Sequence, residues 1–378
     1  MHVGLIIYGS LDTLSGGYLY DRKLVEYLRS QGDMVEIISL PWRNYATHLT
    51  DNLRFKLPSN LDILIQDELN HPSLVFANRG RHPYPVISLV HHLRGSERRP
   101  EWQNMFYRWV EKKYLQSVDG FIFNSTTTKT VVDRFMKTEK PNIVAYPPTD
   151  RFGGPISEGE IIERARHKEL RILFIGNLIY RKGLHTLLEA VRDQPSAFRV
   201  DVVGSLASDS QYTQRIKEYI SRNQLSSFTP ALPGTTRQGR YASGASVFLH
   251  GSLDREPLIE KLKNAHILVV PSSYEGFGIV YLEGMCFGLP AIGTTAGAAS
   301  EIITDGQDGF LIEPENPKEL VDKLKLLQTH RDVLLQMSLA ARARYLRQPK
   351  WDETAGRVRE FLLKQIEKFP PPPCKISL

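Results

Sequence analysis

The stretch Pro271–Pro290, PSSYEGFGIVYLEGMCFGLP, places two glutamates and a glycine-flanked turn at the expected start of a helix. The run Ala265–Val270 before it is short, apolar and rich in β-branched residues, which predicts a buried parallel strand. Proline and serine residues end that strand. Gly276 and Gly278 let the backbone come close to a ligand, and the composition of Ile279–Phe287 favours a helix. Because the first amides of a helix have no partner within it, this turn is expected to attract an anion.

Two carboxylates flank the predicted helix start. Glu275 lies in the loop, and Glu283 falls about one turn after Ile279 on the same helical face, so both can turn toward one ligand. Carboxylates accept hydrogen bonds from paired hydroxyls, such as those of ribose or a hexose. Backbone amides of Phe277, Gly278 and Ile279 would lie beside them at the positive helix end. The alternative is that Glu275 is only an N-terminal helix charge and Glu283 a solvated residue.

The spacing of Glu275, seven residues and Glu283, with Gly-Phe-Gly inside and Gly-Leu-Pro after, closely resembles the donor-site motif of the family 4 glycosyltransferases. These are retaining enzymes of the GT-B fold, in which two Rossmann-like doubly wound domains of the α/β class face a central cleft. The resemblance extends over nearly all of the chain and is strongest from Arg171 to Leu320. It implies a nucleotide-sugar donor, most commonly a UDP-sugar, and leaves the sugar and the acceptor open.

The chain has 378 residues, which exceeds one typical core and predicts two domains. Met1–Tyr8 lacks the features of a signal peptide, and no uncharged stretch is continuous enough to predict a transmembrane helix. Cys286 and Cys374 have no metal-ligand spacing and no plausible disulfide partner. A cytoplasmic protein is therefore expected, with no cofactor.

A strand, glycine loop, helix and strand order occurs twice and predicts two Rossmann-like domains. The first copy consists of Val3–Tyr8, Gly9–Gly17, Tyr18–Ser30 and Met34–Leu40, and the second of Arg171–Ile175, Gly176–Gly183, Leu184–Val191 and Phe198–Gly204. Pro and Gly residues around 141–154 predict a boundary. We expect an acceptor-side domain (1–150), a linker (151–170), a donor domain (171–347), a helix (348–369) that in GT-B proteins typically crosses back to the first domain, and a Pro-rich tail (370–378).

Arg181 and Lys182 precede Gly183 on the loop before the Leu184–Val191 helix, where two cations suit a diphosphate. The alternative is a solvated basic pair. The resemblance implies that Lys182 contacts the donor phosphates. Family members commonly have Gly-Arg where this chain has Gly176 and then Asn, so Arg181 is the expected substitute for the missing cation.

Other site residues follow from the resemblance. His91 comes directly after the predicted strand 85–90, and the family's histidine at this place lines the donor-sugar pocket; the alternative is a histidine that caps the strand. Gly16 and Gly17 resemble the glycine pair that approaches the donor, and Leu253 matches the nucleobase pocket. The catalytic set is therefore His91, Arg181, Lys182 and Glu275.

The sequence contains no Asp-x-Asp pair, so no metal site is expected and the cations and helix amides would neutralise the diphosphate. No carboxylate of the first half can be assigned as a nucleophile. The resemblance then implies front-face attack, with the leaving diphosphate taking the acceptor's proton.

The net charge of +6 is concentrated in one region. Between residues 79 and 113, three glutamates (97, 101 and 111) face eight cations: Arg79, Arg81, Arg94, Arg98, Arg99, Arg108, Lys112 and Lys113. The segment Pro100–Gln116 has an apolar helical stripe of Trp102, Met105, Phe106, Trp109 and Val110. Aromatic residues beside cations suit an anionic membrane surface and a lipid-linked acceptor. The alternative is that the stripe packs on the sheet and the acceptor is a soluble sugar.

Two other functions compete with this interpretation. A nucleotide-sugar 2-epimerase shares the architecture, but it needs acidic and histidine groups at the sugar C2, for which only His91 and Glu275 are candidates. A non-catalytic nucleic-acid-binding protein would fit the basic charge. However, no recognised nucleic-acid motif is present, so nucleic acid is not an expected partner.

Overall fold

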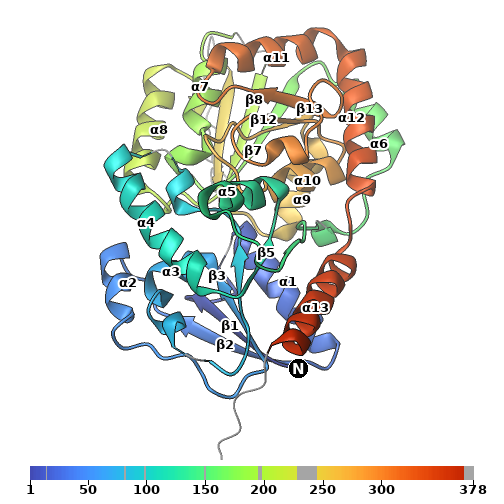
Figure 1. Cartoon of the computed structure of the whole chain (residues 1–378). Helices are drawn as coiled ribbons and strands as arrows, with labels where there is room; N and C mark the ends of the chain where they lie inside the picture. Colours follow the sequence, from blue (N-terminus) through green and yellow to red (C-terminus); the bar gives the residue numbers. More distant parts are fainter. Residues whose placement is uncertain are drawn as a thin grey trace, which may run out of the picture. The chain divides into compact units, whose positions relative to one another are not determined.

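The computed structural model describes residues 1–13, 15–80, 82–97, 99–148, 150–194, 198–227 and 245–369. The predictions that concern Arg81, Arg98, Cys374 and the tail 370–378 lie outside these residues. The chain divides into two compact units, the first formed by Met1–Pro148 with Pro349–Leu378 and the second by Thr149–Gln348 (Figure 1).

The first unit is built on a parallel six-stranded sheet in the order β2-β1-β3-β4-β5-β6. Its strands are β1 (His2–Tyr8), β2 (Met34–Leu40), β3 (Ile63–Asp67), β4 (Val86–Val90), β5 (Gly120–Phe123) and β6 (Asn142–Val144). Its helices are α1 (Gly16–Ser30), α2 (Tyr45–Asp51), α3 (His71–Leu74), α4 (Glu101–Ser117), α5 (Thr126–Met136) and α13 (Trp351–Lys368), with short 3-10 turns η1 (Glu68–Asn70), η2 (Ala77–Arg79) and η3 (Arg94–Ser96).

The second unit has a parallel seven-stranded sheet in the order β13-β12-β11-β7-β8-β10-β9. Its strands are β7 (Leu170–Ile175), β8 (Phe198–Val203), β9 (Ser226–Ser227), β10 (Ser246–Gly251), β11 (Ile267–Val269), β12 (Ala291–Thr294) and β13 (Gly309–Ile312). Its helices are α6 (Glu158–Ala165), α7 (Leu184–Val191), α8 (Ser210–Arg222), α9 (Arg255–Asn264), α10 (Ile279–Cys286), α11 (Pro317–Thr329) and α12 (Arg331–Leu346), with η4 (Asp150–Phe152), η5 (Tyr180–Lys182) and η6 (Ala299–Glu301).

The first sheet buries both of its faces, as a doubly wound fold requires. Successive residues of a strand point to opposite faces, so Leu5 belongs to one core and Ile6 to the other. The core on the Leu5 side includes Leu24 of α1 and Val358 of α13. The core on the Ile6 side includes Val110 of α4. Together with the second parallel sheet, this confirms the prediction of two Rossmann-like domains of the α/β class.

The predicted linker 151–170 is folded into the second unit. Its helix α6 begins with a capping box, in which Ser157 accepts from the amide of Glu160 and the Glu160 side chain accepts from the amide of Ser157. The buried guanidinium of Arg164 then donates to the carbonyls of Phe287 and Gly288, both at 2.8 Å. This segment is therefore a structural part of the second unit and not a free connection.

Helix α4 has apolar residues on two faces. Val110 is buried in the first unit's core, as the alternative interpretation of the apolar stripe expected. The other four stripe residues are not: Trp102, Met105, Phe106 and Trp109 are 71, 63, 44 and 60 % exposed. The alternative that the whole stripe packs on the sheet is wrong.

Among the described residues, none of the helices is both long enough and apolar enough to cross a bilayer.

Candidate functional site

Three loops meet at one edge of the second sheet. They follow β7, β11 and β12, which are neighbours in the order β12-β11-β7. Since all three strands are parallel, their carboxyl ends lie at the same edge, where open α/β sheets bind their ligands. The predicted cations come from the first loop, and Glu275 comes from the second.

Two glycines allow these loops to touch. Gly183 has φ +73°, and a Cβ there would lie 2.1 Å from the carbonyl oxygen of Pro271. Gly297, in the loop after β12, has φ +88°, and a Cβ there would lie 2.1 Å from the carbonyl oxygen of Glu275. That same carbonyl accepts from the amide of Ala298 at 2.9 Å. Only glycine fits positions that combine a positive φ with such close backbone contact.

The half-buried Lys182 and the buried Glu275 form an ion pair where the loops meet. The Lys182 Nζ donates to Glu275 Oε1 at 2.6 Å, and the hydroxyl of Ser272 donates to the same oxygen at 2.6 Å. Burial by itself would raise the pKa of Glu275, but the charges of Lys182 and Arg181 lower it to about 2. Burial lowers the pKa of Lys182, and the charge of Glu275 opposes this. The structure thus joins two predicted catalytic residues that are 93 positions apart.

Arg181 is fixed beside this pair. Its guanidinium donates to the carbonyl of Tyr274 at 2.7 Å and lies 3.7 Å from Glu275 Oε2. Its backbone carbonyl accepts from the amide of Ser273 at 2.8 Å. The 3-10 turn η5 therefore holds two cations around one carboxylate, and a nearby anionic ligand could compete with that carboxylate for them.

Helix α10 begins at the predicted place. Gly278 is its N-cap with φ +92°, Ile279 is its first residue, and Phe277 is buried just before it. Glu283 is also buried, and it accepts from Arg151 at 3.2 Å. Burial raises the pKa of Glu283, although the charge of Arg151 opposes that rise.

Leu253 is half-buried in the loop between β10 and α9. The end of β10 is tied to the end of β8, because the carbonyl of Gly251 accepts from the amide of Gly204 at 2.9 Å. The carboxyl end of β8 is in turn next to that of β7. Leu253 therefore belongs to the same edge of the sheet as the Lys182 loop, and its role in the nucleobase pocket stays a prediction.

A second group of polar residues gathers at the carboxyl edge of the first sheet. His91 follows β4 directly, and its Nε2 lies 3.1 Å from Oδ1 of the fully buried Asp21 on α1. A Cβ at Gly17 would lie 3.2 Å from the His91 ring, so this glycine lets helix α1 approach the imidazole. Gly16 and Gly17 were expected in a loop, but they form the first turn of α1, because Ser15 caps the helix by accepting from the amide of Tyr18.

The first unit also supplies carboxylates that sequence reasoning missed. Asp21 and Asp67 both lie close to His91, although no acid of this half could be assigned to a site from the sequence. Burial and the charge of Asp21 raise the pKa of Asp67 to about 7. Burial also raises the pKa of the neighbouring Glu68 to about 7. Nothing in the spacing of Asp21 and Asp67 signals their contact, since they are brought together only by the fold.

Two groups of described residues offer ligand atoms close enough to share a metal ion. One is Asp21, Asp67 and His91, and the other is Glu68, His71 and Glu111. In the second group His71 is already paired through both ring nitrogens, with the carbonyl of Glu68 at 3.0 Å and the hydroxyl of Tyr45 at 2.9 Å. The absence of a metal in the reaction remains a prediction.

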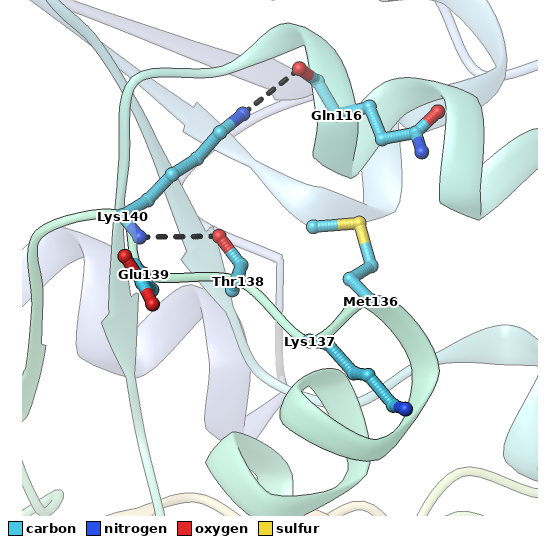
Figure 2. Close-up of a pocket in the computed structure, with 6 residues that line it drawn as sticks. All are labelled: Gln116, Met136, Lys137, Thr138, Glu139 and Lys140. Carbon is cyan, nitrogen blue, oxygen red and sulfur yellow. Dashed lines mark hydrogen bonds between the residues drawn. The ribbon is translucent and has the colours of Figure 1, made fainter.

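Lys140, at the edge of a hollow of about 550 Å³, has a structural role (Figure 2). The Lys140 Nζ donates to the carbonyls of Leu115, Gln116 and Val118 at the end of α4. A cation at this position caps the carbonyls that the helix leaves without partners. A second cavity, of about 300 Å³, lies between η3, α4 and α5 and is lined by Leu93, Arg108, Glu111, Arg134 and Phe135 among others.

Comparisons with known proteins relate this geometry to glycosyltransferases. Residues 169–330 match the family described as Glycosyl transferases group 1. A D-rhamnosyltransferase of Pseudomonas aeruginosa is 26 % identical over 70 % of this chain and 67 % of its own length. An uncharacterised glycosyltransferase of Methanocaldococcus jannaschii is 30 % identical over 40 % of this chain. The matched region covers only 36 % of the length of that relative.

Solved structures confirm the fold. A sucrose-phosphate synthase from Thermosynechococcus elongatus superimposes with a TM-score of 0.78 at 18 % identity, covering 97 % of this chain and 99 % of its own. HepE of Anabaena, solved in complex with UDP and glucose, has a TM-score of 0.71 at 16 % identity and covers 96 % of this chain and 99 % of its own. The chain therefore has the two Rossmann-like domains of the GT-B fold.

The loop contact at Gly297 yields a first prediction. Gly297→Ala should displace the Glu275 loop, because its Cβ would overlap the Glu275 carbonyl. It should therefore destabilise the protein by more than the roughly 1 to 2 kcal/mol that the left-handed conformation alone costs an alanine. Gly306→Ala is the matched control, since Gly306 has φ +74° with open space around it. Urea unfolding measures both. Equal losses in the two variants would contradict the close loop contact.

The pairing of His91 yields a second prediction. Burial alone would lower the pKa of His91, but Asp21, with Asp67 and Glu68, raises it from 6.5 to about 9. Because the folded state binds the proton of His91 more tightly than the unfolded state, this proton stabilises the fold. The stabilisation is complete below pH 6.5 and is lost as the pH rises through about 9. Asp21→Asn should lower the pKa of His91, as measured by NMR titration of the imidazole, and should weaken this pH dependence of stability.

Asp12→Asn is the control for that experiment. Asp12 is an exposed acid near the start of α1, where it interacts with Ser10. Its substitution should leave the titration of His91 unchanged. If the pKa of His91 in Asp21→Asn stayed as high as in the parent, then Asp67 or Glu68, and not Asp21, would hold the proton on the ring.

Proposed function

We propose that this chain is a retaining, metal-independent glycosyltransferase that moves a hexose from a nucleotide-sugar donor, a UDP-sugar, to an acceptor. The observation that carries the proposal is the Lys182–Glu275 pair, flanked by Arg181, at the carboxyl edge of the second sheet. A cation pair beside a deeply ionised carboxylate suits a ligand that has both a diphosphate and free hydroxyls. The match of residues 169–330 to Glycosyl transferases group 1 supports the same chemistry.

Each residue of the second unit has a role in this proposal. Lys182 and Arg181 bind the diphosphate, together with the amides at the start of α10 around Gly278. Glu275 stays ionised because its pKa is lowered to about 2, and it accepts hydrogen bonds from hydroxyls of the transferred sugar. Glu283 accepts from the ribose, and Leu253 contacts the base.

Charge stabilisation is the main catalytic effect in this scheme. As the bond between the anomeric carbon and the diphosphate oxygen breaks, negative charge grows on the diphosphate, and the two cations already in place stabilise it. The acceptor oxygen forms its new bond on the face that the diphosphate leaves, and its proton passes to a diphosphate oxygen. The anomeric configuration is thereby retained, and no metal or protein nucleophile is needed.

The first unit supplies the acceptor side. His91, held by Asp21, would donate a hydrogen bond to the donor sugar. Gly17 has no side chain and so leaves room for the His91 ring. The cavity between η3, α4 and α5 combines the apolar Leu93 and Phe135 with Arg108 and Arg134. This combination supports an acceptor with both an apolar and an anionic part, such as a lipid-linked sugar.

A nucleotide panel tests donor binding. Thermal shifts with UDP, GDP, ADP and their sugars should show stabilisation by one nucleotide class, since a ligand at about 100 times its dissociation constant adds about 2.7 kcal/mol. Glu283→Ala should weaken that binding by roughly 1 to 3 kcal/mol, because the ribose loses a charged acceptor. Glu260→Ala, an exposed glutamate of the same unit, is the control. Unchanged nucleotide binding in Glu283→Ala would refute the ribose assignment.

The leaving-group role of Lys182 gives a kinetic prediction. Lys182→Ala should lower the turnover number on the order of 10² to 10³-fold and raise the Michaelis constant less, because charge on the diphosphate is greatest in the transition state. Activity of the parent in EDTA should be unaffected. Full activity of the variant, abolished by EDTA, would point to a metal and overturn the mechanism. The anomer of the product, determined by NMR, tests retention.

A further inference from the structure

We propose that the exposed apolar face of helix α4, formed by Trp102, Met105, Phe106 and Trp109, docks on the surface of an anionic lipid bilayer. This inference rests on the proposed function and specifies where its lipid-linked acceptor is met. Met105 and Phe106 lie three and four positions after Trp102 and four and three positions before Trp109, so the four residues form one stripe on the helix. Their exposed fractions range from 44 to 71 %.

Most of this stripe does not hold the helix to its unit. Helix α4 is attached through a different face, where Val110, Tyr114 and Leu115 are buried in the core of the first sheet. Phe106 touches Tyr45 edge to face with ring centroids 6.1 Å apart, and it is the least exposed of the four. Contiguous large apolar side chains on a surface indicate an interaction site, whereas single exposed ones do not.

The charges around the stripe select the partner. Lys112 and Lys113 follow it on the helix and are exposed, and neither forms an ion pair with any described residue. The one acid in that turn, Glu111, is buried on the opposite side. Lysines next to tryptophans match the layers of a bilayer, since indoles favour the headgroup region and cations favour anionic lipids.

A second copy of this chain is the alternative occupant of the same face. An anionic bilayer instead neutralises these lysines while the aromatic side chains enter the headgroup layer.

Co-sedimentation of the full chain with phosphatidylcholine vesicles, with and without phosphatidylglycerol, tests the proposal. We expect binding to the anionic vesicles, weakened by salt, and a blue shift of tryptophan fluorescence. Trp102→Ser with Trp109→Ser should reduce the affinity at least ten-fold, because two large aromatic contacts are lost. Lys112→Ser with Lys113→Ser should reduce it about 30-fold, at about five-fold for each charge near the surface.

Trp42→Ser is the matched control, since Trp42 is 54 % exposed in the same unit but lies outside α4. It should leave vesicle binding unchanged. No binding of the parent to anionic vesicles, or equal loss in the Trp42 variant, would overturn the proposal. So would a dimer in light scattering that dissociates when Trp102 and Trp109 are replaced. Nucleotide thermal shifts on the same variants report donor binding separately, so a failure of membrane docking is distinguishable from a failure of the proposed enzyme.

Discussion

The candidate site of the second unit depends on one ion pair, between the half-buried Lys182 and the buried Glu275. Taking two charges out of water is costly, and their attraction compensates only if further hydrogen bonds satisfy them, as Ser272 does here. Removing one partner of such a pair typically costs 3 to 5 kcal/mol, because the other charge stays buried alone. The pair therefore holds the loops after β7 and β11 together, and Gly183 and Gly297 supply the room that this closeness needs.

The same arrangement of opposite charges recurs in the first unit, with a different result. His91 lies close to both Asp21 and Asp67, and these acids, with Glu68, raise the pKa of its imidazole to about 9. Around Glu275 the cations outnumber the acid, and the carboxylate stays ionised. Each unit thus presents at its sheet edge a group whose charge is fixed throughout the neutral pH range. Groups of fixed charge suit a reaction that depends on electrostatic stabilisation. They suit less well a reaction in which a side chain must take up or release a proton.

Elements governed by local patterns could be predicted from the sequence. The bounds of β2 and α7 were expected to the residue, because apolar periodicity and nearby glycines mark their ends. The start of α1 was missed, since the cap by Ser15 draws Gly16 and Gly17 into the helix. Asp21, Asp67 and Gly297 were also missed. Their roles arise from contacts between segments that are distant in the chain, and no local pattern encodes such contacts.

Helix α4 shows why exposure is difficult to infer from periodicity. Its apolar residues cover more of its circumference than one core-facing side needs, so the sequence indicates too much apolar surface but not which part is buried. The structure answers this: Val110, Tyr114 and Leu115 pack in the same core as residues of β4 and β5, while the two tryptophans are exposed. The surplus apolar side chains bring no stability to the fold while they face water. Burying these side chains against a partner would therefore favour binding, and the neighbouring lysines favour a partner with an anionic surface.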